Sequence, residues 1–277
     1  MIFAILVIVS FPSNSLSQQI KSQRIVSLAP STTEILFALG LDDEIVGVTI
    51  NCNYPSEAKD KEKVGTFSQP DIEKILSLKP DIIFATGLEQ ALTVEQLRQL
   101  RFKVYISDPS NMQGLFTSIR EIGNLTRREK EAEILINLMR NKIDQIRAKV
   151  KFIPQNKRPK VFIEIWHDPL MTTGKCSFVD ELINLAGGIN IACDVFKAYS
   201  YISPEIVIKR DPDCIILGHR SKAETLNIIK NQLGWKEIKA IKNNCIYNDI
   251  NPDLFLRPGP RLVQGLEEIY QKLYPAK

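Results

Sequence analysis

The sequence is poor in histidine and lacks the short motifs on which most enzyme chemistry depends. Only two histidines, His167 and His219, occur in the 277 residues, and no GxSxG, HExxH, P-loop or GxGxxG pattern is present. A serine hydrolase needs a histidine near a nucleophile at a strained turn, a zinc protease needs paired histidines on a helix, and nucleotide enzymes need a glycine-rich phosphate loop. We therefore expect no enzyme activity, no catalytic residue and no cofactor.

Cysteine pairs and basic clusters are missing as well. The five cysteines form no CxxC pair, so a zinc ribbon or a redox motif is not supported, and their odd number leaves at least one thiol unpaired within the chain. The net charge is only +4, and no Lys/Arg cluster is interleaved with aromatic residues, so nucleic acid is not an expected partner. The length is sufficient for two domains of ordinary size.

Long apolar runs are limited to one stretch near the N-terminus. Residues 2–11 (IFAILVIVSF) form a run of ten, about half of the roughly 20 residues that a membrane-spanning helix needs. Ser15-Leu16-Ser17 follows it and is typical of a signal-peptidase site, with cleavage before Gln18. We expect residues 1–17 to be a signal peptide and the mature protein to be periplasmic. A buried strand is the alternative, because no Lys or Arg precedes the run. No cysteine follows it, so we expect no lipobox.

Strand-like and helix-like segments alternate along the first half of the chain. Ser31 with Glu34 three residues later indicates a capping box, and the helix that it opens is expected to end at Gly40. Another helix is expected from about Pro70 to Leu78. Short β-rich runs that predict strands occupy residues 24–29, 45–49, 82–85 and 103–106. The alternation predicts parallel βαβ units in an N-terminal α/β lobe, residues 22–124.

A long amphipathic helix is predicted in the middle of the chain. Thr126 is the expected cap of a stretch without Gly or Pro until Pro154, in which apolar residues recur at spacings of three to five. This pattern predicts a connecting helix of about seven turns over residues 125–152. The alternation then restarts in a C-terminal α/β lobe, residues 158–277. Its expected elements are strand 160–165, a helix from Ser177 to Gly187-Gly188, helix 204–210, strand 214–217 and a last helix over about 260–273.

An internal repeat relates the two lobes. Glu73 stands seven residues before Pro80-Asp81, and Glu205 stands seven residues before Pro212-Asp213. Each Glu lies in a short predicted helix, and each Pro-Asp pair opens an apolar strand. Chance similarity between βα units is the alternative, since Pro is common at the start of a helix and Pro-Asp is common before a strand. With the central helix, the repeat predicts two similar parallel-sheet lobes with a ligand cleft between them.

These stretches resemble one known family over nearly the whole mature chain. RIVSLAPSTTEILFALG (24–40), VGTFSQPDIEKILSLKPDIIFATG (64–87), SFVDELINLAGGINI (177–191) and SPEIVIKRDPDCII (203–216) are similar to the periplasmic binding proteins with a helical backbone. These proteins serve ABC importers of cobalamin, haem and iron-siderophores. The resemblance implies a monomer that captures a corrinoid and delivers it to a permease dimer with its ATPase subunits. Haem or a ferric siderophore is the alternative ligand.

The resemblance also implies which residues contact the ligand. Tyr54, Phe67 and Tyr199 match aromatic positions that pack against the corrin in the vitamin B12-binding members, and Asp253 matches a polar contact. All three aromatics fall in strand-to-helix connections, where a rigid ring can face a cleft, although loop packing is the alternative.

Some positions depart from the pattern of the vitamin B12-binding members. Thr86 and Ile165 stand where those proteins have Trp and Phe, so we expect a less aromatic cleft. A cysteine that forms a disulfide in those proteins is Ala186 here, so that disulfide is absent.

The remaining candidates follow from position in the predicted fold. Trp166, His167 and Asp168 come directly after strand 160–165, at the end of a parallel strand where ligands bind. His167 is a candidate axial ligand to a metal chelate, but we favour a hydrogen-bonded loop histidine. An anionic siderophore needs an arginine cluster, for which Arg257 and Arg261 are the only candidates.

Glu73 and Glu205 are the candidate contacts with the transporter. In the resembled family, an acidic residue at each of these places meets an Arg-rich pocket on one permease subunit. The alternative is that both are solvated charges on helix surfaces.

Overall fold

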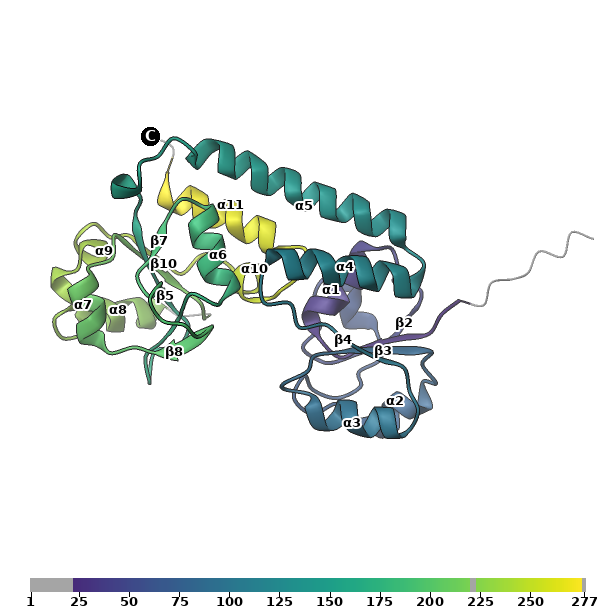
Figure 1. Ribbon diagram of the computed structural model, residues 1–277. Helices are drawn as coiled ribbons and strands as arrows, with labels where there is room; N and C mark the ends of the chain where they lie inside the picture. Colours follow the sequence, from purple (N-terminus) through teal and green to yellow (C-terminus); the bar gives the residue numbers. More distant parts are fainter. Residues whose placement is uncertain (1–21, 220–222, 276–277) are drawn as a thin grey trace, which may run out of the picture.

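The computed structural model describes residues 22–219 and 223–275 and contains two lobes, each built on a parallel sheet (Figure 1). The first sheet has the strand order β2-β1-β3-β4, and the second has the order β10-β9-β5-β7. Read from its β7 edge, the second sheet places its strands in the same chain order as the first, so the two lobes share one topology. The strands are β1 (Ile25–Ser27), β2 (Ile45–Val48), β3 (Ile82–Ala85), β4 (Val104–Ile106), β5 (Lys160–Glu164), β7 (Ile189–Asn190), β9 (Cys214–Leu217) and β10 (Ile246–Tyr247).

Helices cover both sheets, and a small antiparallel pair of strands extends the second lobe. This pair consists of β6 (Met171–Thr173) and β8 (Tyr199–Tyr201). The helices are α1 (Pro30–Ala38), α2 (Ile72–Ser77), α3 (Ala91–Gln99), α4 (Met112–Thr126), α5 (Glu129–Val150), α6 (Phe178–Leu185), α7 (Pro204–Arg210), α8 (Ala223–Asn231), α9 (Lys239–Lys242), α10 (Asp253–Leu256) and α11 (Leu262–Leu273), with short 3₁₀ turns η1 (Ser56–Asp60), η2 (Gln155–Lys157) and η3 (Trp235–Glu237). The α/β class predicted from the sequence is confirmed.

The long helix α5 spans both lobes and packs against α4 and α11 (Figure 1). It has 22 residues and is therefore about 33 Å long. Its buried residues recur every three or four positions and form one continuous stripe: Ala132, Ile136, Met139, Ile143, Ile146 and Val150. A single apolar cluster contains this stripe from Ala132 to Ile146 together with sheet residues of both lobes, such as Phe84 and Ile216. Because the lobes share this core, they do not pack as separate bodies.

The start of the long helix differs from the prediction. Thr126 is the last residue of α4, and its hydroxyl donates to the Ile122 carbonyl at 2.7 Å. Arg127 then adopts a left-handed conformation (φ 59°), and α5 begins at Glu129. Two helices thus meet at a break without Gly or Pro, which is why the uninterrupted pattern concealed it.

The capping box predicted at the start of α1 is wrong. The helix begins at Pro30, its N-cap residue is Ala29, and no side chain caps it. Pro suits this first helical position because its missing N–H needs no partner there. Glu34 instead forms an ion pair with Arg261. Ser177, by contrast, caps α6 as predicted and accepts the Asp180 N–H at 3.1 Å.

The internal repeat appears in the structure as the same hydrogen bond in both lobes. The backbone N–H of Arg24 donates to Asp81 Oδ2 at 2.7 Å, and that of Lys160 donates to Asp213 Oδ2 at 2.8 Å. In each lobe the Asp of the Pro-Asp pair therefore ties the third strand of the lobe to the first. The helix before it starts at Pro204 as predicted, but in the first lobe it starts at Ile72 after an Asp71 cap rather than at Pro70.

Candidate ligand-binding cleft

A cavity of about 410 Å³ lies between the two lobes, at the carboxyl ends of β1, β3 and β4. Ligands of parallel α/β sheets bind outside the carboxyl ends of the strands, so this position is typical of a binding site. The first lobe contributes Pro30, Ser31, Asn51, Phe67, Thr86, Glu89, Ser107, Asp108 and Pro109 to its wall, and the second contributes Tyr199, Leu256, Arg257 and Pro258.

Three of the residues predicted from the sequence meet in this cavity. Phe67 and Thr86 lie on the wall of the first lobe, and Tyr199 faces them from the second. Burial raises the pKa of Tyr199, and the negative charge of Glu89 in the opposite lobe raises it further. Glu89 and Tyr199 line the same cavity from opposite lobes.

Buried Gln90 positions the wall of the first lobe and was not identified from the sequence. Its amide nitrogen donates to the carbonyls of Leu28 (2.9 Å) and Phe67 (2.7 Å), and its oxygen accepts the Thr86 N–H at 2.9 Å. One side chain thus fixes the ends of two strands and the Phe67 loop. Nothing in the local pattern distinguishes it from a surface glutamine.

The small β6–β8 sheet extends the aromatic surface of the second lobe. Tyr199 pairs with Thr173, Met171 pairs with Tyr201, and Trp166 forms a bridge with Met171. Directly opposed residues in antiparallel strands point to the same face of the sheet. Met171, Trp166 and Tyr201 therefore share the face of Tyr199, and Tyr201 remains 68% exposed. This face, which we call the β6–β8 platform, continues the wall of the cavity.

The residues after β5 gather around a buried carboxylate. Glu164 is fully buried, and its Oε1 atom lies 3.1 Å from His167 Nδ1 and 3.2 Å from His219 Nε2. Both imidazoles are oriented by this one oxygen, which leaves His167 Nε2 and His219 Nδ1 as the outward nitrogens. Within the described residues, no group of three or more His, Cys, Asp or Glu side chains has the geometry of a metal site.

The neighbouring candidates of this segment lie outside the wall of the interlobe cavity. Ile165 packs against the core next to Gly218, and the Asp168 carbonyl accepts the Trp166 indole N–H at 3.0 Å. Contact of Ile165, Trp166, His167 and Asp168 with a ligand remains a prediction.

Tyr54 lies in a different place from the other aromatic candidates. It borders a groove of about 860 Å³ between α1, α5 and α11, and the guanidinium of Arg261 lies 3.9 Å from the centre of its ring. Although this groove is larger than the interlobe cavity and similarly open, it runs along the long helix and lies away from the strand ends. Tyr54 therefore does not share a cavity with Phe67 and Tyr199.

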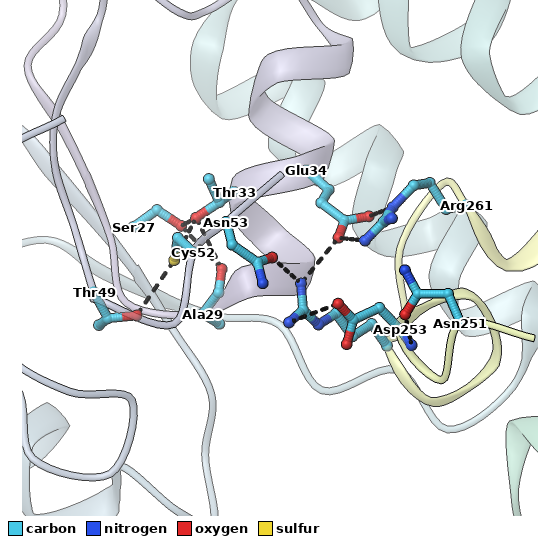
Figure 2. A network of polar contacts seen from close by, with 11 residues as sticks. Ser27, Ala29, Thr33, Glu34, Thr49, Cys52, Asn53, Asn251, Asp253 and Arg261 are labelled. Atoms are coloured by element: carbon cyan, nitrogen blue, oxygen red, sulfur yellow. Dashed lines mark hydrogen bonds and ion pairs between the residues drawn. The ribbon is translucent and has the colours of Figure 1, made fainter. Parts of the chain in front are cut away.

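An ion-pair network joins the lobes beside the cavity (Figure 2). Arg261 donates to both carboxylate oxygens of Glu34 in α1, at 2.5 and 2.8 Å. Arg257 donates to Asn53 at 2.8 Å and lies 3.5 Å from Glu34 and 3.1 Å from Asp253. The two arginines that the sequence indicated as an anion-binding cluster are thus engaged within the protein, as is Asp253.

Two pseudo-symmetric parallel-sheet lobes, joined by one long helix and separated by a lined cleft, define a class of bilobal solute-binding proteins. A family model for periplasmic binding proteins matches residues 25–251, and the chain belongs to this family. It is 37% identical over 91% of its length to the uncharacterized ABC transporter substrate-binding lipoprotein YvrC of Bacillus subtilis, of which it covers 80%. It is 30% identical over 92% of its length to the vitamin B12-binding protein of Pectobacterium atrosepticum, of which it covers 90%.

Solved structures with the same fold bind different chelates. The vitamin B12-binding protein BtuF of Vibrio cholerae has 28% identity and a TM-score of 0.75, with 91% of this chain and 96% of that chain covered. The haem-binding protein HutB of the same organism has 26% identity and a TM-score of 0.80, with 92% and 100% covered.

The family establishes the general activity of the chain. It is a substrate-binding protein of an ABC transporter and not an enzyme, and such proteins work with a permease and an ATPase. No helix within residues 22–219 and 223–275 is long and apolar enough to cross a membrane. The predicted signal peptide, residues 1–17, lies outside the described residues. Since the Bacillus relative is a lipoprotein, the absence of a lipid anchor stays a prediction.

Proposed function

We propose that this substrate-binding protein captures cobalamin or a closely related corrinoid between its lobes. The observation that carries the proposal is the apolar surface on both sides of the interlobe cavity, with Phe67 on one lobe and Tyr199 on the other. The β6–β8 platform prolongs this surface with Met171 and Tyr201. Rigid aromatic walls give large contact area to a flat macrocycle at low entropic cost. A cavity of about 410 Å³ encloses only part of such a ligand, so the platform would contact the remainder.

Haem is the second candidate ligand, and the two histidines favour it. Glu164 holds one ring nitrogen of His167 and one of His219, which is the way a carboxylate orients an imidazole that binds a metal. If haem were bound, its iron would be coordinated by one of the outward imidazole nitrogens. A corrinoid held by its macrocycle faces would leave both histidines uncoordinated.

Titration of the apo protein distinguishes these ligands. Cyanocobalamin, haem and a ferric hydroxamate are added separately, and heat and tryptophan fluorescence are recorded. Trp166 is 57% exposed and shares the platform, whereas Trp235 is fully buried. We therefore expect cyanocobalamin to quench the wild-type protein and to quench the Trp166→Phe variant much less. If no form of cobalamin produces heat or quenching, the ligand assignment is wrong.

We further propose that Glu73 and Glu205 dock the loaded protein onto its permease. Both are exposed, and each is the second residue of its helix, α2 or α7, in equivalent positions of the two lobes. A twofold-symmetric permease presents two equal positive pockets, and a pseudo-symmetric protein can place one carboxylate in each. Such contacts fix orientation and accelerate encounter more than they add affinity.

The docking role is tested by separating ligand binding from delivery. The double variant Glu73→Ala/Glu205→Ala should keep its ligand affinity and lose uptake and transporter-stimulated ATP hydrolysis. The control is Glu95→Ala/Glu237→Ala, which also removes one exposed carboxylate from each lobe. Normal uptake by the Glu73/Glu205 variant would refute the docking role.

A further inference from the structure

We infer, on the basis of the proposed function, that the cleft selects chelates without net negative charge and that Glu34 sets this selectivity. Glu34 does not line the interlobe cavity. It acts on the cavity through the two arginines next to it, which could otherwise recognise an anionic ligand.

The wall of the cavity carries more negative than positive charge. Among the described residues, those of the wall that carry charge are Glu89, Asp108 and Arg257. Glu89 is exposed in the loop after β3, and Asp108 accepts the Gly87 N–H at 2.5 Å after β4. Two carboxylates from the first lobe therefore face one guanidinium from the second.

That guanidinium is already occupied by acceptors of the protein itself. Arg257 contacts oxygens of Glu34, Asn53 and Asp253. Arg261 holds the same Glu34 carboxylate with two hydrogen bonds (Figure 2). Within residues 22–219 and 223–275, the wall and the ion-pair network attached to it contain four carboxylates, those of Glu34, Glu89, Asp108 and Asp253, and two guanidinium groups, those of Arg257 and Arg261. The excess is two negative charges.

An anionic chelate therefore meets repulsion or must displace an internal ion pair. The pair between Glu34 and Arg261 is poorly accessible, because only 4% of Glu34 is exposed. If the ion pair stays in place, a ligand carboxylate is repelled by an uncompensated carboxylate of the protein. At a separation of about 8 Å and an effective dielectric constant of about 20, this repulsion weakens binding by a factor of roughly thirty. A chelate with amide side chains or a positive charge avoids this loss. The cleft thus favours an uncharged or cationic macrocycle over carboxylate-bearing porphyrins and siderophores.

Two ligand pairs that differ only in charge test the inference. One pair is cyanocobalamin and the monocarboxylate obtained by hydrolysing one of its amide side chains. The other is haem and its dimethyl ester, in which both carboxylates are masked. The two affinities are compared at low salt within any pair whose members bind. We expect the amide or the ester to bind at least about tenfold more tightly than the compound with the free carboxylate.

Variants of the chain identify the groups responsible. Glu89→Gln removes an exposed charge from the wall and should reduce the discrimination about tenfold, whereas Glu95→Gln on the neighbouring helix α3 should leave it unchanged. Glu34→Gln removes the carboxylate that Arg261 holds and one of the two carboxylates near Arg257, and it should abolish or reverse the preference. Because this change also removes a buried partner of Arg261, circular dichroism must first show a folded protein. The Glu89 variant tests the wall charge independently.

The outcomes separate the charge selectivity from the corrinoid assignment. Equal affinities within the corrin pair refute the selectivity while the corrinoid function stands. If corrins fail to bind and the haem diester binds more tightly than haem, the corrinoid assignment is refuted and the charge selectivity is supported. If none of the four compounds binds, both fall. If the folded Glu34→Gln variant discriminates between the members of a pair as strongly as the wild type does, Glu34 does not set the selectivity.

Discussion

Loss of the ion pair between Arg261 and Glu34 should strongly destabilise the protein. The change is Arg261→Met, which keeps an unbranched apolar stem and removes the charged guanidinium group. In the folded protein, the Glu34 carboxylate accepts two hydrogen bonds from Arg261 at 2.5 and 2.8 Å, and the two side chains are only 2% and 10% exposed. After the change, Glu34 retains only Arg257, at 3.5 Å.

The expected magnitude follows from the charge that stays behind. Removing one partner of a buried ion pair costs about 3–5 kcal/mol, because the other charge is left without compensation in a poorly solvated place. We expect the lower part of this range, since Arg257 remains near Glu34. For a chain of this size the loss corresponds to a fall in Tm of roughly 6–20 °C. The double variant Glu34→Leu/Arg261→Met should lose less than Arg261→Met alone, because no unpaired charge remains.

Urea and thermal unfolding, followed by circular dichroism, measure these differences. The matched control is Arg120→Met, which breaks the pair between Arg120 and Glu133, whose side chains are 41% and 46% exposed. Exposed pairs contribute about 0–1 kcal/mol, so the control should remain close to wild type. If Arg261→Met costs no more than the control, or if the double variant is less stable than the single one, the reasoning about an uncompensated buried charge is refuted.

Three further predictions concern the ligand and the N-terminus. Tyr199→Ala should weaken ligand binding by about 1–3 kcal/mol in calorimetry if Tyr199 is an aromatic anchor, and unchanged affinity would remove it from the site. His167→Ala should leave the visible spectrum of the bound chelate unchanged, because a corrinoid held by the faces of its macrocycle does not need the imidazole as a ligand; a shifted absorption band would instead indicate metal coordination. Mass spectrometry of the exported protein should give a chain that starts at Gln18, and a chain retaining residues 1–17 would contradict the signal peptide.

The elements that local sequence rules describe were predicted closely. Helix 204–210 and strand 214–217 have the predicted bounds, because Pro marks the helix start and an apolar run marks the strand. Ser177 caps α6 since its hydroxyl needs only an N–H three residues away. The two Pro-Asp pairs predicted related lobes, and the structure adds the reason: each Asp accepts an N–H from the first strand of its lobe.

The candidate site was only partly predictable. Phe67, Thr86 and Tyr199 line the interlobe cavity, and their contact with a ligand stays a prediction. Tyr54 lies under Arg261 instead, and the role of Gln90 depends on carbonyls at residues 28 and 67. Strand pairing between β6 and β8 was needed to place Met171 beside Tyr201, since the two strands are separated by a helix and a long connection.

The sequence alone determined the α/β class, the two lobes, the long connecting helix and the family, because hydrophobic periodicity, Pro and capping residues act over a few positions. Tertiary structure alone decided where the charges go. Glu34 fits a local capping box, yet it pairs with Arg261, which is 227 residues away in the chain. That partner exists only when α1 of one lobe meets the segment before α11 of the other, and burial there makes it costly to leave either charge without its partner. The charge of the cleft therefore results from how the lobes meet.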